Sequence, residues 1–233
     1  MEDLTNRWRS LSLTEEEETR VDLTKEKKKI GAMLAAKFFT QRSVSIEAVA
    51  KTFRPLWRTR GNFEVCEGKD NILLIDFEME ANAEKVIQGQ PWAFDRHLMV
   101  VQRYDGTVPV QNLVFRSTTF WIQIHNLPFQ LLTIEAALSI GETIGKVSRP
   151  KDLGEMRGGN FMRVRVEVDI TKPLCRGKKI SWDEKGDGWV AFMYERLPNI
   201  CYWCGLVLHN DKDCIQWLNS RGTLQTDDQQ FGP

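Results

Sequence analysis

Three cysteines and one histidine near the C-terminus stand in the spacing C-x2-C-x4-H-x4-C. They are Cys201, Cys204, His209 and Cys214, and they fall within fourteen residues. Three thiolates and one imidazole complete the tetrahedral coordination of Zn2+ and leave no open position for water or a substrate, as in structural rather than catalytic zinc sites. The spacing therefore predicts that this segment folds around one structural zinc ion.

The rest of the chain is long enough to fold without the metal. Its 233 residues suffice for one large domain or two small ones with their own cores, and 42% of them are hydrophobic, as in globular proteins. The 32 Lys and Arg balance the 32 Asp and Glu, so the formal net charge is zero. A neutral chain has no overall field that attracts nucleic acid, and such binding must depend on local patches.

Cysteine usage indicates a reducing compartment. Three of the five cysteines belong to the zinc spacing, which leaves Cys66 and Cys175 as unpaired thiols. The N-terminus has no apolar stretch suited to a signal peptide, and no run approaches the ~18 apolar residues of a membrane span. We expect an intracellular protein of the nucleus or the cytoplasm, with no membrane contact.

The first 32 residues are charged and poor in apolar side chains. An acidic run occupies residues 15–18 and a lysine-rich cluster residues 25–29. Such composition favours a disordered arm over 1–32. Its lysines at 27–29 fit a nuclear import signal, a phosphate contact, or simply a solvated charge run.

Periodicity predicts an α+β domain over residues 33–105. Strands are expected at 33–39, 63–65, 72–77 and 98–101, and helices from Ser43 or Ser45 to about residue 57 and over 81–90. The order strand, helix, strand, strand, helix, strand is the split βαβ, ferredoxin-like arrangement of RNA-recognition motifs. We therefore predict an RNA-recognition-like βαββαβ domain.

A second α+β unit, an extension associated with the first, is predicted over residues 111–197. It has strands at 120–124, 161–168, 179–182 and 189–194, and a helix over 133–144 that Thr133 caps. The zinc knuckle then occupies 198–218 and a polar tail 219–233. Five tryptophans are interpreted as core or structural residues, namely Trp57, Trp92, Trp121, Trp182 and Trp189.

Five stretches carry a family resemblance: AKFFT at 36–40, GQPWAFD at 89–95, FWIQIHNLP at 120–128, RVRVEVDITKPL at 163–174 and YERLP at 194–198. Together with the knuckle spacing they resemble a plant family in which an RNA-recognition-like domain of unknown function precedes a CCHC zinc knuckle. Such chains occur in retrotransposon-derived, Gag-like proteins. The resemblance implies zinc binding and nucleic-acid binding.

Two positions depart from the expected pattern. Gag-type knuckles have glycine just before the histidine, where this chain has Leu208, which should loosen or reshape the site without removing a ligand. RNA-recognition motifs stack bases on aromatic residues of their central strands, but Ile72 and Leu74 occupy the corresponding third-strand positions. Base stacking on that sheet is therefore not expected.

The knuckle and the basic strands supply the candidate nucleic-acid contacts. Aromatic rings stack on unpaired bases and cationic groups meet phosphates. The residues assigned to these roles are Tyr202, Trp203, Trp217, Arg196, Lys212, Arg163, Arg165, Lys178 and Lys179. The alternative for the strand at 161–168 is a solvated face on which Glu167 and Asp169 compensate the arginines.

We predict a zinc-dependent protein that binds single-stranded RNA or DNA and is not an enzyme. His97 and His125 lie in no recognisable nucleophile motif, phosphate-binding glycine loops are missing, and no small-molecule substrate is expected. The alternative is a protein-interaction or self-assembly module with a purely structural knuckle, which the neutral charge favours. A third possibility is a fragment of a longer polyprotein.

Overall fold

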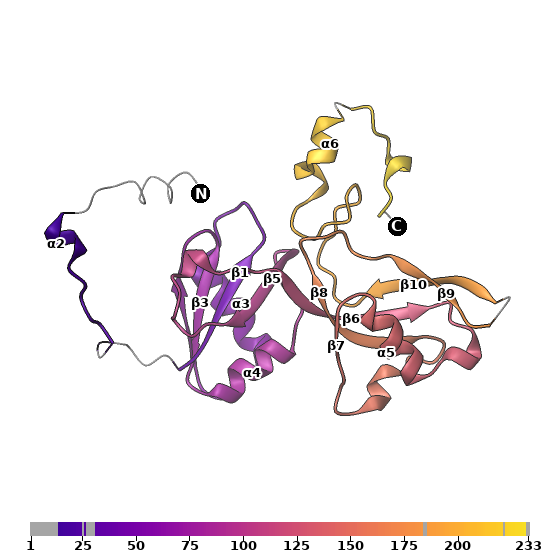
Figure 1. Cartoon of the computed structure of the whole chain (residues 1–233), viewed down its shortest axis with the longest axis horizontal. Coiled ribbons are helices and arrows are strands. Elements are labelled where there is room, and N and C mark those ends of the chain that lie inside the picture. The colour runs from indigo at the N-terminus through magenta and orange to yellow at the C-terminus, as the bar shows by residue number, and fades with distance from the viewer. Residues whose placement is uncertain (1–13, 25, 27–30, 184–185, 221, 232–233) are drawn as a thin grey trace. The chain divides into compact units, whose positions relative to one another are not determined.

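The computed structural model describes residues 14–24, 26, 31–183, 186–220 and 222–231 (Figure 1). The chain divides into two units, residues 1–30 and 31–233, which are treated separately. In the first unit, one helical turn, α2 (Glu15–Glu18), lies where the sequence indicated an unstructured arm. Thr14 and Glu17 form a reciprocal capping box that satisfies the free backbone N–H groups of this turn. The lysines at 25 and 27–29 lie outside the described residues.

The second unit is a mixed α+β structure with two antiparallel sheets (Figure 1). The first sheet and its helices comprise β1 (Ala32–Phe38), α3 (Ile46–Trp57), β2 (Phe63–Glu67), β3 (Ile72–Phe77), α4 (Glu80–Gln88), β4 (Trp92–Phe94) and β5 (His97–Arg103). Its strand order is β2-β3-β1-β5-β4. The short edge strand β4 forms a hairpin with β5 and was not anticipated from the sequence.

Helix α3 shows how the local sequence sets this half of the structure. Ser45 is its N-cap, and the Ser45 hydroxyl accepts a hydrogen bond from the Ala48 N–H at 3.3 Å. Val49, Phe53 and Trp57 recur at helical spacing, and all three are buried against the sheet. The Phe53 and Trp57 rings stack with their centroids 4.7 Å apart, so this face anchors the first core.

The second sheet follows after a linker. It comprises β6 (Ser117–His125), α5 (Ile134–Glu142), β7 (Lys146–Ser148), β8 (Met162–Asp169), β9 (Gly177–Ser181) and β10 (Asp187–Tyr194), in the strand order β7-β8-β6-β10-β9. The Thr133 hydroxyl caps α5 by accepting the Ala136 N–H at 3.2 Å. At Gly141 an added Cβ would lie 2.9 Å from Val164, so glycine permits the close packing of α5 on β8.

The remaining elements are short. They are the helix α6 (Ile215–Asn219) and the 3-10 turns η1 (Val110–Asn112), η2 (Phe129–Leu131), η3 (Leu153–Met156), η4 (Asp211–Asp213) and η5 (Thr226–Asp228). None of the described helices combines the length and the apolar composition that crossing a membrane requires.

Strand β5 contributes to two hydrophobic cores. Met99 and Val101 pack in the core beneath α3 and α4, whereas Leu98 and Val100 on its other face pack in the core of the second sheet. Side chains alternate between the two faces of a strand, so Leu98 and Val100 lie on the face of the first sheet opposite α3 and α4. The half of the unit that is built on the second sheet therefore packs against this helix-free face. Ile72 on β3 is only 4% exposed. The helix-free face of the first sheet is thus partly an internal packing surface.

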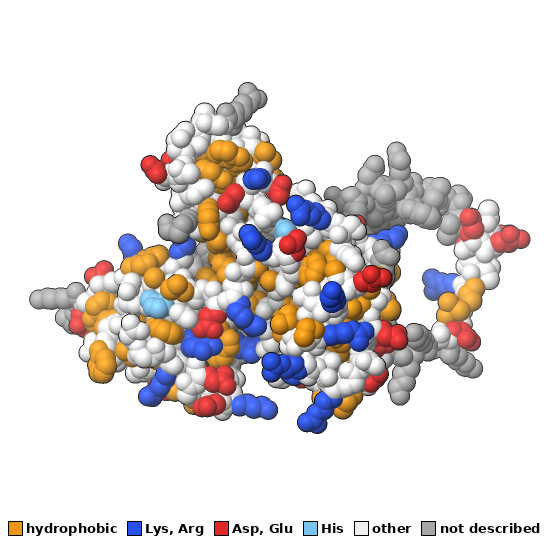
Figure 2. Space-filling view, turned by 180° about the vertical axis from the view of Figure 1, so that it is seen from behind, with side chains coloured by type: hydrophobic (Ala, Val, Ile, Leu, Met, Phe, Trp, Pro, Cys, Tyr) orange, Lys and Arg blue, Asp and Glu red, His pale blue; other side chains and the backbone are white. Residues whose placement is uncertain are grey.

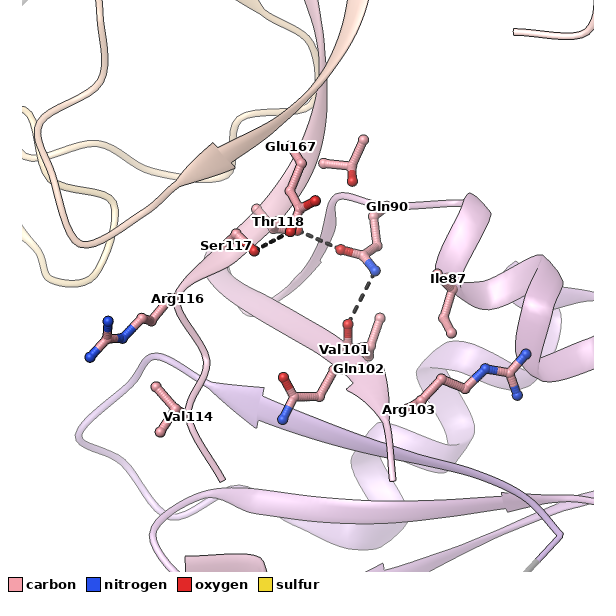
Figure 3. A pocket seen from close by; sticks show the side chains of 11 residues that line it. Ile87, Gln90, Val101, Gln102, Arg103, Val114, Arg116, Ser117, Thr118 and Glu167 are labelled. Carbon is pink, nitrogen blue, oxygen red and sulfur yellow. Dashed lines mark hydrogen bonds between the residues drawn. The ribbon is translucent and has the colours of Figure 1, made fainter. Parts of the chain in front are cut away.

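Gln90 links the two sheets (Figure 3). Its side-chain amide donates to the Val101 carbonyl at 3.1 Å, and its side-chain oxygen accepts the Thr118 hydroxyl at 2.7 Å. An open pocket of about 580 Å³ lies beside this contact, and it is lined from both sheets and by the linker residues Val114 and Arg116. The Gln90 side chain is buried. Its two hydrogen bonds satisfy the polar atoms that burial removes from water.

Candidate zinc centre and nucleic-acid interface

The four residues of the cysteine and histidine spacing converge in space. One ligand atom from each of Cys201, Cys204, His209 and Cys214 lies within 4.8 Å of all the others. Zinc–sulfur bonds of about 2.3 Å and zinc–nitrogen bonds of about 2.0 Å place tetrahedral ligands roughly 3.4–3.8 Å apart. The Cys204 Sγ and His209 Nε2 atoms are 3.3 Å apart. The cluster therefore fits one structural zinc ion.

Hydrogen bonds within backbone turns position these ligands without involving the metal. The Gly205 N–H donates to the Cys201 carbonyl and the Cys201 N–H to the Leu206 carbonyl, both at 2.8 Å. Gly205 has φ = +74°, which strains other residues, and an added Cβ would meet the Phe231 ring at 2.3 Å. The Asp211 carboxylate accepts the Tyr202 N–H at 2.7 Å and so fixes the loop between the ligands.

Leu208 replaces the glycine expected before the histidine, and the structure gives it a packing role. It is half-buried against the second-sheet core, next to Val207, which is fully part of that core. A leucine at this position therefore anchors the knuckle to the domain rather than loosening the metal site.

Burial raises the pKa of the Cys201 thiol, and burial likewise raises the pKa of Cys204. Without metal these thiols hold their protons at neutral pH. Zinc binds the thiolate form, so metal binding releases protons into solution.

The aromatic residues of the knuckle are only partly exposed. Trp203 and Trp217 stack on each other, with centroids 4.8 Å apart and planes 14° apart, and both are half-buried, as is Tyr202. Ring stacking holds α6 against the first knuckle turn, because Trp217 belongs to α6. The two ring faces that stack on each other are closed to a base.

The three arginines assigned to phosphate contact have partners inside the molecule. The Arg163 guanidinium pairs with Glu195 at 2.9 Å and lies 4.4 Å from the centroid of the Trp121 ring. Arg165 donates to the Gln88 carbonyl. Arg196 donates to the carbonyls of Gly89 at 2.7 Å and Gln90 at 3.0 Å.

Arg165 and Arg196 thus cap the C-terminal end of α4 from the second half of the unit. The last carbonyls of a helix lack intrahelical partners and carry partial negative charge, which a guanidinium group satisfies. Burial lowers the pKa of both arginines. Their main role in the structure is to join the two sheets.

We expect Arg165→Ala and Arg196→Ala each to lower the free energy of unfolding by about 1–2 kcal/mol, because charge-assisted hydrogen bonds to the α4 end are lost from a partly exposed site. Urea unfolding followed by circular dichroism measures the change. Arg149→Ala, an exposed arginine, is the matched control and should be neutral. Equal stability of all three variants would show that the hydrogen bonds from Arg165 and Arg196 to the end of α4 do not hold the two halves of the unit together.

The three lysines assigned to nucleic-acid contact differ from these arginines. Lys178 and Lys179 on β9 and Lys212 in η4 are exposed, and no described carboxylate lies within ion-pair distance of them. These are the assigned cations whose charge remains available to a phosphate.

A groove of about 850 Å³ runs between the knuckle and the first sheet. The Asn210 side chain contacts His97 at 3.4 Å and joins the two walls. The charged residues of the lining are Lys37, Arg42, Arg96 and Lys212, with Asp95, Asp211 and Asp213. Arg42 and Asp95 are 4.0 Å apart and mostly exposed, so this ion pair is weak and leaves Arg42 accessible.

The C-terminal tail contains a contact that the sequence did not suggest. The Phe231 N–H donates to the Tyr202 carbonyl at 3.1 Å, and the Arg176 guanidinium lies 5.1 Å from the Phe231 ring centroid. The available signal for this contact in the sequence was one aromatic residue, Phe231, in a polar tail. The tail therefore lies against the knuckle at Phe231.

Comparison with known families agrees with this geometry. The zinc knuckle family matches residues 168–216, a span that includes β9 and β10 as well as the four ligands. A domain of unknown function, DUF4283, matches residues 27–111. The chain therefore carries a DUF4283-type domain followed by a CCHC zinc knuckle.

A curated relative is an uncharacterized protein of Arabidopsis thaliana. It is 27% identical over 131 residues, which are 55% of this chain and 41% of the relative. The matched region thus spans less than half the length of that protein.

Proposed function

We propose that the protein binds single-stranded nucleic acid through its zinc knuckle and acts without enzymatic chemistry. The observation that carries the proposal is the four-ligand zinc cluster beside a groove with four cationic side chains. Zinc knuckles read unpaired bases, which stack on aromatic rings and present their hydrogen-bonding edges. Cys204 and His209 form no catalytic pair in this proposal, because both are zinc ligands.

The proposal includes a domain assignment. Residues 33–105 form a ferredoxin-like, RNA-recognition-like domain, 111–197 an associated extension and 198–218 the knuckle. The strand order β2-β3-β1-β5-β4, with α3 and α4 between strands, supports the split βαβ arrangement, β4 being an added edge strand. A retroelement-derived, Gag-like origin is also proposed, and it rests on the sequence resemblance.

In this proposal the groove provides the second surface that a small knuckle needs. Bases contact the knuckle while the backbone passes Arg42, Arg96 and Lys212. Each neutralised phosphate releases counterions, so affinity falls as salt rises. Because the chain has no net charge, this attraction depends on local cationic side chains such as those of the groove.

The test is a titration of labelled single-stranded RNA, single-stranded DNA and duplex at several salt concentrations, after zinc stoichiometry has been measured. We expect one zinc per chain, preference for single strands, and at least tenfold weaker binding for the variant Cys201→Ser plus Cys204→Ser, since one or more stacked bases would be lost. Unchanged binding without zinc would refute the role of the knuckle.

A double charge reversal tests the groove. Arg42→Glu plus Arg96→Glu should weaken single-strand binding and reduce the slope of log affinity against log salt by about 1.4, because each phosphate contact contributes roughly 0.7. The matched control reverses Lys51 and Lys151, which are exposed elsewhere. An equal slope change in both double variants would indicate a nonspecific charge effect.

A further inference from the structure

One face of the second sheet is partly open to solvent at β10. Along β10, Val190 and Phe192 are buried, so Trp189 and Met193 project from the opposite face, where they are 49% and 58% exposed. Sequence analysis had placed Trp189 among the core residues. Two large apolar side chains on one strand therefore leave apolar surface open to solvent.

The strand register places aromatic and cationic groups together on this face. Lys179 of β9 stands directly opposite Trp189, and Ala191 stands between Gly177 and His125. The His125 ring stacks on Phe161, with centroids 4.8 Å apart and planes 29° apart. The rear view in Figure 2 shows hydrophobic, basic and acidic side chains interspersed over the second sheet.

Gly177 determines how Trp189 lies. A Cβ on Gly177 would fall 2.5 Å from the indole ring, so the ring rests over the β9 backbone at this residue. The indole is thereby held against the sheet with part of its surface open to solvent. A ring held in this way loses little freedom when a base stacks on it.

A polar network closes the other end of the face. The Glu195 carboxylate accepts hydrogen bonds from Arg163 at 2.9 Å and from Gln123 at 3.0 Å, and Gln123 contacts His125 at 2.9 Å. Arg163 neutralises Glu195 there. The open part runs from His125 to Trp189, with Lys179 beside Trp189 on the edge strand β9 and Asp187 beyond them at the hairpin end.

We propose that this face, which we call the platform (Trp189, Lys179, His125 and Phe161), binds unpaired bases of single-stranded nucleic acid. Trp189 stacks on one base, the His125–Phe161 pair stacks on a second, and Lys179, beside Trp189 at the sheet edge, meets a phosphate next to the first base. Sheets that recognise RNA stack two or three bases in this way, and stacking tolerates any base sequence. A cation opposite the exposed indole favours a polyanion over an apolar protein partner. This inference extends the proposed nucleic-acid binding but needs no contribution from zinc.

The experiment compares full-length, zinc-loaded variants by fluorescence anisotropy with short labelled single-stranded RNA and DNA. We expect Trp189→Ala to weaken binding about tenfold, the size of one lost base stack, and Trp189→Phe to retain most of the affinity. Phe129→Ala is the matched control, because Phe129 is 90% exposed outside the platform. Crosslinking to the peptide that contains Trp189 locates the contact. Circular dichroism and zinc content confirm that each variant is folded.

The outcomes separate the two proposals. If Trp189→Ala binds like the unmodified chain while Cys201→Ser plus Cys204→Ser does not, the platform is wrong and the knuckle proposal stands. The reverse result supports the platform and removes the knuckle as the reader. Absence of all binding overturns both. A change in sedimentation of Trp189→Ala at unchanged affinity overturns the platform and assigns the face to self-association.

Discussion

Removal of zinc is expected to unfold the knuckle while both sheets stay folded. Structural zinc binding contributes apparent free energies on the order of 10–16 kcal/mol, and a segment of this size has no comparable core of its own. The sheets keep two separate clusters of buried residues that need no metal. Limited proteolysis in the presence of a chelator should cleave within residues 198–218 first, while circular dichroism of the sheets changes little.

Cys66→Ser is the matched control for this prediction, because Cys66 is an exposed free thiol outside the cluster. It should leave one zinc per chain and the same protease resistance, whereas Cys201→Ser should lose both. A knuckle that resists protease equally with and without zinc would show that Val207, Leu208 and the tail hold the segment instead.

Replacement of Gln90 by alanine is expected to lower the free energy of unfolding by about 2–4 kcal/mol. The side chain joins the Val101 carbonyl and the Thr118 hydroxyl across the two sheets, and the substitution leaves both polar groups buried without partners. Urea unfolding gives the change as a shift in midpoint at constant slope. Gln130→Ala, at an exposed glutamine, should have no measurable effect.

A second substitution distinguishes lost hydrogen bonds from lost packing. In the Gln90→Ala background, Thr118→Val removes the hydroxyl left without a partner and should recover part of the stability. Suppose instead that Thr118→Val lowers the free energy of unfolding by the same amount in the Gln90→Ala background as in the unmodified chain. That result would mean that the two side chains are not energetically coupled and that the contact between the sheets rests on apolar packing.

Most regular elements of the two sheets were predictable, because their signals are local. Ser45 and Thr133 cap helices at the expected places, and the alternation from Met162 to Asp169 marks a strand with one buried face. The β4 strand was missed because three residues are too short for a periodic pattern. Trp57 and Trp189 look alike in sequence, yet one is buried and the other is half exposed, since burial depends on what packs across each sheet.

The zinc ligands and the helix and strand pattern are determined by the sequence itself, because ligand spacing, capping and side-chain alternation act over a few residues. The roles of the arginines are decided by tertiary structure alone. Arg165 reaches a carbonyl 77 residues away and Arg196 one 107 residues away, and no local pattern specifies such a partner. The same holds for the platform and the groove, which exist only after distant strands and loops have come together.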